Sequence, residues 1–480
     1  MSSSSLEAKS AQSHHIKSRY FMTWRWHFYA GLFVIPFLII LSLTGLIMLF
    51  DEEIEFARYE SILAVVPEHH TTSLTQQMAS VNAAFPDATI TQFSPARSDD
   101  TVNRFSLETH DGRSLIAAVN PYSGTLQGTI DRDRSVYQWV NRIHANLLIG
   151  DVGDRLLEIA ASLGILLVVT GVALWWPNDH ARRAGFLTLR LGQGRRVWLR
   201  DLHANLGGVL SLMLLFFLIS GLAWTGIWGA KLMQAWNTFP TYYTWGEKPN
   251  SQLTHQDLNP TGHKQMPWNL EQAPLPQSEE GPTHDHTNMT TQMPAATHSH
   301  LGSIPLDEVV EQAHQLGFTR YHVYLPLSEE GVYTIAANSM NGDNFDPRQD
   351  RTLHLDQYSG TPVLDVTWQD YTIFAKWMAA SVSLHQGDVG LWNKVFNVLF
   401  CLITLFLCVS GTMMWWIRRP QRARLGVPPT FQSDRVWKVG LVTLFIIGLL
   451  FPLGGMTILV VLAIDALIIQ RVGKLRQWFQ

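Results

Sequence analysis

The chain has 480 residues, of which 46% are hydrophobic and only 15% are charged. Its formal net charge of -4 is too small to suggest a nucleic-acid partner. The hydrophobic residues are gathered in long runs, which predict a chain that crosses a lipid bilayer.

Four apolar runs contain at least the ~20 residues that a membrane-spanning helix needs. They cover 26–50, 156–176, 204–228 and 391–417. The first run is too long for a cleavable signal peptide and lacks a small-residue cleavage site, so we expect it to remain as an anchor. A later apolar stretch, 439–470, is split by Pro452 and two glycines, and we expect a hairpin of two short helices there.

Basic residues are concentrated on one side of these runs. The segments rich in arginine and lysine are 1–25, 177–202, 418–438 and 471–480, whereas 51–153 and 229–391 are acidic on balance. By the positive-inside rule, the basic segments lie in the cytoplasm and the long acidic segments lie outside. We therefore expect a cytoplasmic N-terminus and two large outer domains.

Each outer segment contains the pattern of a small α+β domain. A stretch with helical spacing, 74–85 or 306–316, precedes alternating stretches typical of strands, and Tyr-Ser-Gly then follows in both copies. We expect these domains at 51–134 and 303–370. An interfacial helix and a span follow each domain, at 135–176 and 371–417, and the third span with its leading histidine covers 203–228.

Residues 229–246 form a short outer segment, and 247–302 form an insert rich in Pro, Thr, Gln, Asn and His. Its few aliphatic residues cannot bury enough surface to offset the loss of chain entropy, so we expect disorder. Imidazole suits copper and related metals. The closely spaced histidines that could bind such a metal are His284, His286, His298 and His300. A polar linker without metal remains the alternative.

Four other histidines recur in register in a twofold internal repeat: His27, His144, His203 and His385. His27 and His203 open the first and third runs, and each is followed after 18 residues by a glycine, Gly45 or Gly221. His144 and His385 precede the second and fourth runs, and Gly171 and Gly411 follow them after 27 and 26 residues. Because ionisable residues at membrane boundaries are rare, this register predicts a function.

No run contains a second histidine, so a site with two histidines must join two helices. The repeat pairs His27 with His203 at the inner face and His144 with His385 at the outer face. Two imidazoles suffice as axial ligands of a b-type haem, and the sequence has no Cys-x-x-Cys-His for covalent c-type attachment. We therefore predict two haem b groups per chain. For each histidine alone, a polar residue at the membrane surface is the alternative.

At about 1.5 Å per residue, each glycine lies near the membrane face opposite its own histidine. A missing side chain there would let a flat macrocycle slide between helices, although small residues also serve helix packing. Arg25 and Arg200, two and three residues before their histidines, could pair with haem propionates or act only as positive-inside charges. Asp151 and Asp388 could orient imidazoles or cap helices.

These features resemble the PepSY-associated transmembrane proteins, also called iron-regulated membrane proteins. The motifs that carry the resemblance are Trp-Arg-Trp-His27, His144-Ala-Asn, Leu-His203-Ala-Asn and the Gly-Asp-Val-Gly sequences after His144 and His385. The resemblance implies an inner-membrane, haem-containing protein of Gram-negative bacteria. Some members of the family reduce ferric siderophores in the periplasm.

The expected fold is an all-α transmembrane bundle of four core helices plus a C-terminal hairpin, built from a twofold internal repeat, with two α+β PepSY-like periplasmic domains. The expected function is electron transfer that reduces a ferric siderophore or ferric chelate in the periplasm. The donor would be a quinol from the membrane lipid or a cytoplasmic reductase. A metal or siderophore transporter and a non-redox PepSY binding protein remain alternatives.

Overall fold

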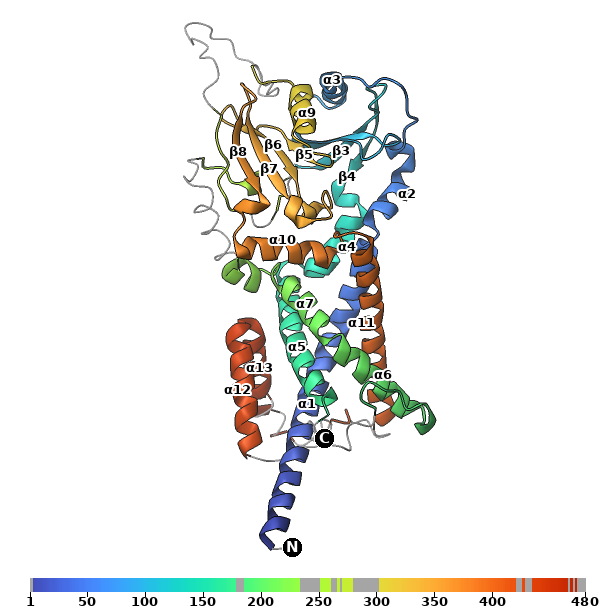
Figure 1. Cartoon of the computed structure of the whole chain (residues 1–480), viewed down its shortest axis with the longest axis vertical. Coiled ribbons are helices and arrows are strands. Elements are labelled where there is room, and N and C mark those ends of the chain that lie inside the picture. The colour runs from blue at the N-terminus through green and yellow to red at the C-terminus, as the bar shows by residue number, and fades with distance from the viewer. Residues whose placement is uncertain are drawn as a thin grey trace. The chain divides into compact units, whose positions relative to one another are not determined.

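The computed structural model describes residues 3–177, 185–233, 251–259, 266–267, 270–278, 302–419, 425–427, 434–464, 467–468 and 471–472. The chain forms two compact units (Figure 1). The helical unit comprises residues 1–46, 142–233 and 398–480, and the sheet unit comprises residues 47–141 and 234–397. The histidines His284, His286, His298 and His300 lie outside the described residues.

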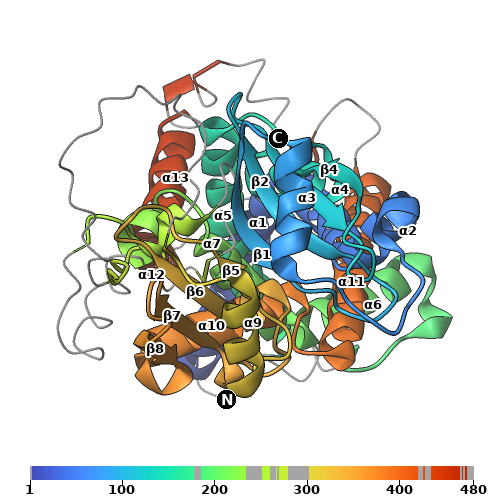
Figure 2. The same ribbon diagram turned by 90° about the horizontal axis from the view of Figure 1, so that it is seen from above.

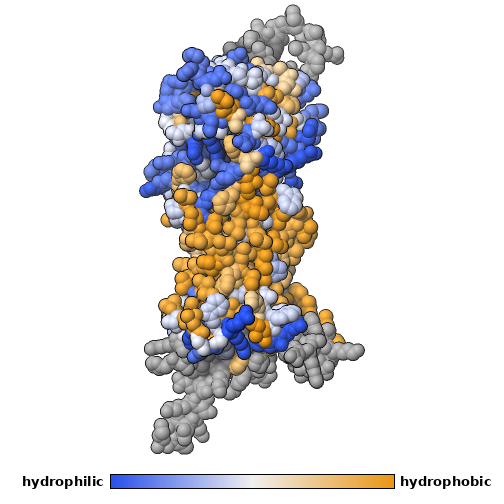
Figure 3. Space-filling model, turned by 90° about the vertical axis from the view of Figure 1, so that its right-hand side faces the viewer, coloured by the Kyte–Doolittle hydropathy of each residue, from blue (hydrophilic) through white to orange (hydrophobic). Residues whose placement is uncertain are grey.

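Among the described residues, three helices are long and apolar enough to cross a membrane. They are α1 (Ser3–Met48), whose apolar part is Arg19–Met48, α5 (Asp151–Trp175) and α11 (Leu391–Arg418). Two shorter apolar helices, α12 (Asp434–Leu450) and α13 (Pro452–Ile464), pack against each other. Hydrophobic side chains cover most of the face of the helical unit that Figure 3 shows. These helices confirm the prediction of a membrane protein.

The expectation of four core helices is wrong at the third run. This run is divided into α6 (Arg195–Val209) and α7 (Ser211–Leu222), which are bent by 57° relative to each other. Two successive glycines, Gly207 and Gly208, weaken the helix just before the bend. Gly208 also packs against Trp175 of α5 so closely that an added Cβ would lie 2.2 Å from the indole. The close approach to α5 and the weak helix together account for the break.

The expectation of two separate α+β domains is also wrong, because one antiparallel sheet of eight strands runs through both copies. Its strand order is β4-β3-β2-β1-β5-β6-β7-β8. The strands are β1 (Ala88–Ser94), β2 (Asn103–Thr109), β3 (Ser114–Val119), β4 (Leu126–Asp131), β5 (His322–Tyr324), β6 (Val332–Ala337), β7 (Arg351–Asp356) and β8 (Pro362–Thr367). The fold is therefore a mixed helical and antiparallel-sheet protein and not an all-α bundle with two separate domains.

The two halves of the sheet join between β1 and β5. Gln92 pairs with Tyr324 and Phe93 with Val323. In separate domains both strands would be edge strands with unpaired backbone N–H and C=O groups, and joining them satisfies these groups. The helices α3 (Leu74–Ala84) and α9 (Leu306–Gln315) lie over the same face of the sheet (Figure 2). Their apolar sides enclose a single core with Phe93, Phe105 and Ile335.

The opposite face of the sheet is covered at its two ends. At the β4 end, α2 (Asp51–Leu63) contributes Leu63 to an apolar cluster with Ala118 and Ile130. At the β8 end, α10 (Ile373–Gln386) packs Ala375 and Ala379 against Val366. The short helix α4 (Val136–Asn146) follows the first half of the sheet in the chain.

Of the insert 247–302, which the composition predicts to be largely disordered, the structure describes residues 251–259, 266–267 and 270–278. Leu258, Met266 and Leu275 are buried against Tyr324 of β5. These apolar side chains are few, so the composition of the insert remains polar. Their packing nevertheless holds this part of the insert on the sheet. The wholly buried His255 reaches His354 of β7, and their Nε2 atoms lie 3.1 Å apart.

Candidate functional site

His27 lies in α1 with its imidazole against the backbone of α5. Its Nδ1 is 3.1 Å from the carbonyl oxygen of Leu167 and 3.2 Å from Oγ1 of Thr170. Since a carbonyl can only accept a hydrogen bond, Nδ1 carries the proton. A Cβ at Gly171 would lie 3.1 Å from Cε1 of His27. The glycine therefore allows the ring to lie directly on the helix.

His203 of α6 has the same surroundings on α11. Its Nδ1 lies 2.8 Å from Oγ of Ser410, and a Cβ at the next residue, Gly411, would lie 3.4 Å from Cε1. The Ser410 hydroxyl donates to the carbonyl of Leu407 at 3.1 Å. Because its single proton is used there, this hydroxyl accepts the hydrogen bond from Nδ1–H of His203.

His144 of α4 repeats the arrangement on α1. Its Nδ1 lies 2.8 Å from Oγ1 of Thr44, which donates to the carbonyl of Ile40 at 2.7 Å. The following residue is Gly45, where a Cβ would lie 3.9 Å from Cε1 of His144. Burial lowers the pKa of His144 to about 4, so its imidazole is neutral near pH 7.

His385 is in α10 of the sheet unit, and its backbone carbonyl accepts a hydrogen bond from Asn397 at 3.0 Å. The glycine that matches it in the repeat, Gly221, is in α7 and follows Ser220. The Ser220 hydroxyl donates to the carbonyl of Phe216 at 2.8 Å, as the other three hydroxyls do to their own helices. The local structure around this glycine therefore matches the other three copies.

The three histidines of the helical unit thus share one geometry. In each, a threonine or serine hydroxyl accepts a hydrogen bond from Nδ1–H, and the glycine after it makes room for the ring. This tautomer leaves a lone pair on Nε2, which is the form in which a neutral imidazole binds a metal. His27 and His203 also lie close enough to interact electrostatically. The helical unit therefore brings together the inner pair of histidines.

The basic residues near the inner pair have partners of their own. Arg200 lies 2.9 Å from Asp201, a buried carboxylate that also holds Arg190 at 2.7 Å. Arg25 lies over the ring of Tyr29, with its guanidinium carbon 5.6 Å from the ring centre. The paired Asp201 reduces the charge that Arg200 can offer to a propionate.

Sequence reasoning missed Arg418 as a candidate neighbour of the inner pair. Its guanidinium carbon lies 4.4 Å from the ring centre of Trp24 and 5.6 Å from that of Phe28, on either side of His27 in α1. It follows Gly411 by seven residues, about two helical turns, so both positions lie on one side of α11. That spacing was the signal in the sequence, but Arg418 was interpreted only as a positive-inside charge.

The recurring aspartates occupy different surroundings. Asp151 is exposed in the first turn of α5, where its negative charge interacts favourably with the helix dipole. Asp388 is in the sheet unit, where burial and the neighbouring charge of Asp51 raise its pKa to about 7. The two residues are therefore matched in sequence but not in environment.

Within the described ranges, no group of three or more His, Cys, Asp or Glu side chains could hold a metal ion. The candidate ligands come as single histidines from different helices, which suits the two axial positions of a haem. Cys401 and Cys408 of α11 are free thiols.

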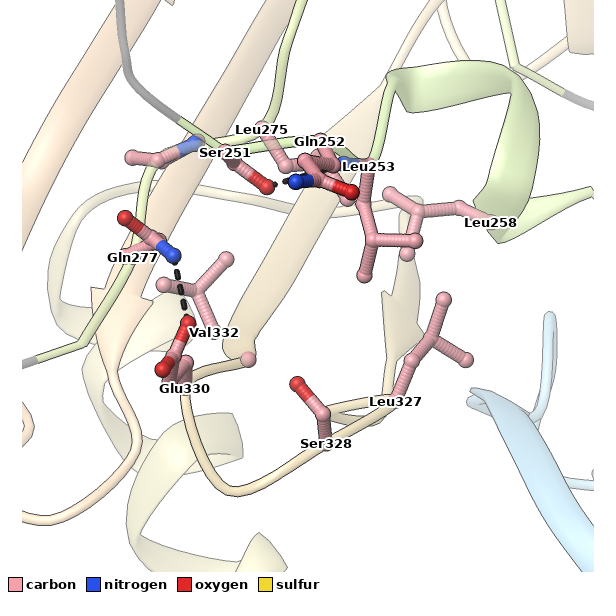
Figure 4. A pocket seen from close by; sticks show the side chains of 12 residues that line it. Ser251, Gln252, Leu253, Leu258, Leu275, Gln277, Leu327, Ser328, Glu330 and Val332 are labelled. Atoms are coloured by element: carbon pink, nitrogen blue, oxygen red, sulfur yellow. Dashed lines mark hydrogen bonds between the residues drawn. The ribbon is translucent and has the colours of Figure 1, made fainter.

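The sheet unit also has an open pocket of about 400 Å³ between the ordered part of the insert and the loop from β5 to β6 (Figure 4). Leu253, Leu258 and Leu275 line one side of it, and Gln277 donates a hydrogen bond to Glu330 across the other. Its lining contains none of the repeated residues. The repeated histidines, and not this pocket, are the strongest candidate site.

One family model matches the chain. It describes the PepSY-associated TM region and covers residues 24–418, which include all four repeated histidines and all four glycines. No curated protein matches the chain.

Proposed function

The chain belongs to the family of PepSY-associated transmembrane proteins, and from this premise we propose that it carries electrons across a membrane through two haem b groups. Their destination would be a ferric siderophore or another ferric chelate, from which reduction releases iron. The observation that supports this proposal most directly is the arrangement of histidine, hydroxyl and glycine found three times in the helical unit.

The chemistry of these residues would suit a haem held by two imidazoles. His27 and His203 would hold one group through Nε2, and the sequence repeat assigns His144 and His385 to the other. Thr170, Ser410 and Thr44 fix the tautomer and the ring orientation, which also raises the basicity of the ligand nitrogen. When bound, haem supplies a carrier of single electrons. Arg418, Arg25 and Arg200 would lie on the side of the inner propionates.

Reduction requires one electron for each ferric ion. The donor would be a quinol in the membrane or a cytoplasmic reductase, and the ferric chelate would accept the electron. Fe(II) is low in the affinity series of divalent metals and is held weakly by hard oxygen ligands, so its release follows reduction. The donor is therefore oxidised and iron is reduced, and the protein undergoes no net change.

We place the protein in the inner membrane of a Gram-negative bacterium, with its N-terminus in the cytoplasm and the sheet unit in the periplasm. The support is the concentration of arginine and lysine in 177–202, 418–438 and the chain ends. In this orientation the proposed site at His27, near the cytoplasmic end of the apolar part of α1, would be the nearer one to a cytoplasmic donor.

A metal or siderophore transporter is the second candidate. The observation that favours it is the break between α6 and α7, because interrupted helices line substrate sites in many transporters. The tight packing of Gly208 on Trp175 argues against an open pathway at that break. A transporter would also leave the shared geometry of the histidines without a purpose.

Difference spectra of the purified protein, reduced with dithionite and oxidised, separate these functions. We expect b-type bands and close to two haem groups per chain. His27→Ala and His144→Ala should each remove one population, whereas His314→Ala, an exposed histidine of α9, should keep both. Wild-type protein without haem bands would rule out the electron-transfer proposal and leave the transporter.

A further inference from the structure

The middle of the sheet's second face is polar, although its two ends are covered by apolar packing. Register places Ser106, Gln92 and Tyr324 in one row across β2, β1 and β5, and Arg104, Ser94 and His322 in the next row on the same face. Gln92, Ser106 and Tyr324 are buried. Such a row of buried polar side chains is unusual in a sheet that has a normal apolar core on its other face.

Arg132 lies across this polar row. It belongs to a short 3-10 helix (Arg132–Arg134) after β4, and its Nη2 lies 2.6 Å from Oγ of Ser106 and 3.4 Å from Oε1 of Gln92. Its Nε is buried and has no hydrogen-bond partner among the described residues. One donor of this guanidinium is therefore unsatisfied.

Arg104 is the second cation of the patch. Arg104 and Arg132 are close enough to repel each other, and Arg97 adds to the positive potential at Arg104. In the part of the chain that the structure describes, no carboxylate pairs with Arg104 or Arg132, whereas Arg97 is paired with Glu52. Burial and the charge of Arg104 lower the pKa of Arg132 to about 10.

The neighbouring acid does not neutralise these cations. Asp343 accepts from Nε2 of His322 at 3.2 Å, and Nδ1 of His322 lies 2.7 Å from Oγ of Ser94. This carboxylate is thus engaged at the far side of the patch. Two uncompensated guanidinium groups on a half-buried surface are unfavourable unless an anion binds between them.

We propose that Arg104 and Arg132, the latter held by Ser106 and Gln92, form a binding site for an anionic ferric chelate with carboxylate or similar oxygen groups. Guanidinium groups pair with planar oxyanions through two parallel hydrogen bonds, and the low dielectric of a half-buried surface strengthens the interaction. The site deepens the proposed function, on which it rests, by naming the charge class of the substrate. It would select negatively charged chelates over neutral ones.

Binding of gallium(III) citrate to the full-length protein in detergent tests this site. Gallium(III) mimics ferric iron but is not reduced under these conditions, so the result does not depend on haem or on electron transfer. We expect Arg104→Gln and Arg132→Gln each to weaken binding by about tenfold or more. The matched control is Arg113→Gln, which removes an equal charge from an exposed pair with Asp111 and should bind as the wild type does.

Arg104→Lys keeps the charge but lacks the two parallel donors of the guanidinium, so it should bind no better than the wild type and no worse than Arg104→Gln. Equal binding by the wild type and both glutamine variants would overturn the proposal. Free citrate or inorganic phosphate that binds as tightly as gallium citrate would also overturn it, because the patch would then recognise any oxyanion. The haem spectrum of the same samples reports on the electron-transfer proposal separately.

Discussion

Thr170 donates its hydroxyl proton to the carbonyl of Leu166 at 2.7 Å and can therefore only accept from Nδ1 of His27, which lies 3.2 Å away. A back-bonded hydroxyl of this kind belongs to the helix and has a fixed direction. It determines which ring nitrogen of His27 is protonated. Thr44 and Ser410 are bonded to their own helices in the same way. In all three cases the hydroxyl of the facing helix fixes the tautomer of the histidine.

Removing these hydroxyls should weaken haem retention unequally. His27 keeps the carbonyl of Leu167 when Thr170→Val removes the hydroxyl, whereas Thr44 is the partner found for Nδ1 of His144. We expect Thr44→Val to weaken haem retention by about 10- to 100-fold, as loss of a partner to a ligating histidine usually does, and Thr170→Val to weaken it less. Haem content after dilution in detergent measures this difference.

Thr44→Ser is the control, because it keeps the hydroxyl and should keep the haem. Equal losses in Thr44→Val and Thr170→Val would contradict the role assigned to the Leu167 carbonyl.

Substitution of the glycines by alanine should reduce haem content to different extents, depending on the space beside each glycine. A Cβ would lie 3.1 Å from the imidazole at Gly171, 3.4 Å at Gly411 and 3.9 Å at Gly45. The first distance forces the His27 ring to move, and the last is an ordinary contact. Haem content should therefore fall most in Gly171→Ala and least in Gly45→Ala. The reverse order would show that the glycines make room for something other than the rings.

The histidines and glycines could be predicted because they recur at matching spacings, which are visible in the sequence itself. It did not give a role to Thr44, Thr170, Ser220 and Ser410, although each precedes a repeated glycine. A hydroxyl beside a glycine has many uses in a helix, and only the distance to Nδ1 distinguishes them. The family was likewise predicted from these motifs and is confirmed over residues 24–418.

The errors in the predicted fold have one physical origin. The pairing of β1 with β5 joins residues more than 200 positions apart, and no local pattern in either strand encodes it. Gly208, just before the bend at Leu210, packs against Trp175 of another helix, and this contact cannot be read from the sequence of the bend. The composition of the insert is polar, as the sequence shows. It does not reveal that Leu258 and Met266 pack on the sheet, because that contact depends on residues far away in the chain.

Asp307 should stabilise the packing of the two halves of the sheet unit against each other. This residue of α9 accepts hydrogen bonds from the backbone of Leu74 at 2.7 Å and of Thr75 at 2.9 Å, so it caps α3 from the other half. We expect Asp307→Ala to lower the free energy of unfolding by about 1 kcal/mol, the usual value of a lost cap. Thermal unfolding followed by circular dichroism measures it.

The same residue predicts a dependence on pH. Burial opposes ionisation of Asp307, but the hydrogen bonds from Thr75 and Leu74 outweigh it and lower its pKa below the usual value of 3.8. The stabilisation is therefore present above about pH 4 and is lost as the pH falls through the lower, folded value. The difference in melting temperature between wild type and Asp307→Ala should shrink at pH 3. A constant difference would show that the charge contributes nothing.

The buried pair His255 and His354 predicts loss of stability in mild acid. His255 must donate from Nδ1 to the carbonyl of Ala273, 2.7 Å away, so its Nε2 accepts from Nε2–H of His354. Nδ1 of His354 then accepts from Thr334 at 2.9 Å, and both rings are neutral. Burial lowers the pKa of His255 to about 4 and that of His354 well below 6.5.

Because the folded pKa values are lowered, the unfolded chain takes up protons first as the pH falls. The contribution of the pair is fully present above the unfolded value of 6.5 and is lost as the pH falls from there toward about 4. Residues 251–259 and 270–278 should become sensitive to a protease at pH 5 while they resist it at pH 7.5. The double variant His255→Leu with His354→Leu has nothing to protonate and should resist equally at both values. If wild type and double variant respond alike to acid, groups other than this pair hold the segment on the sheet.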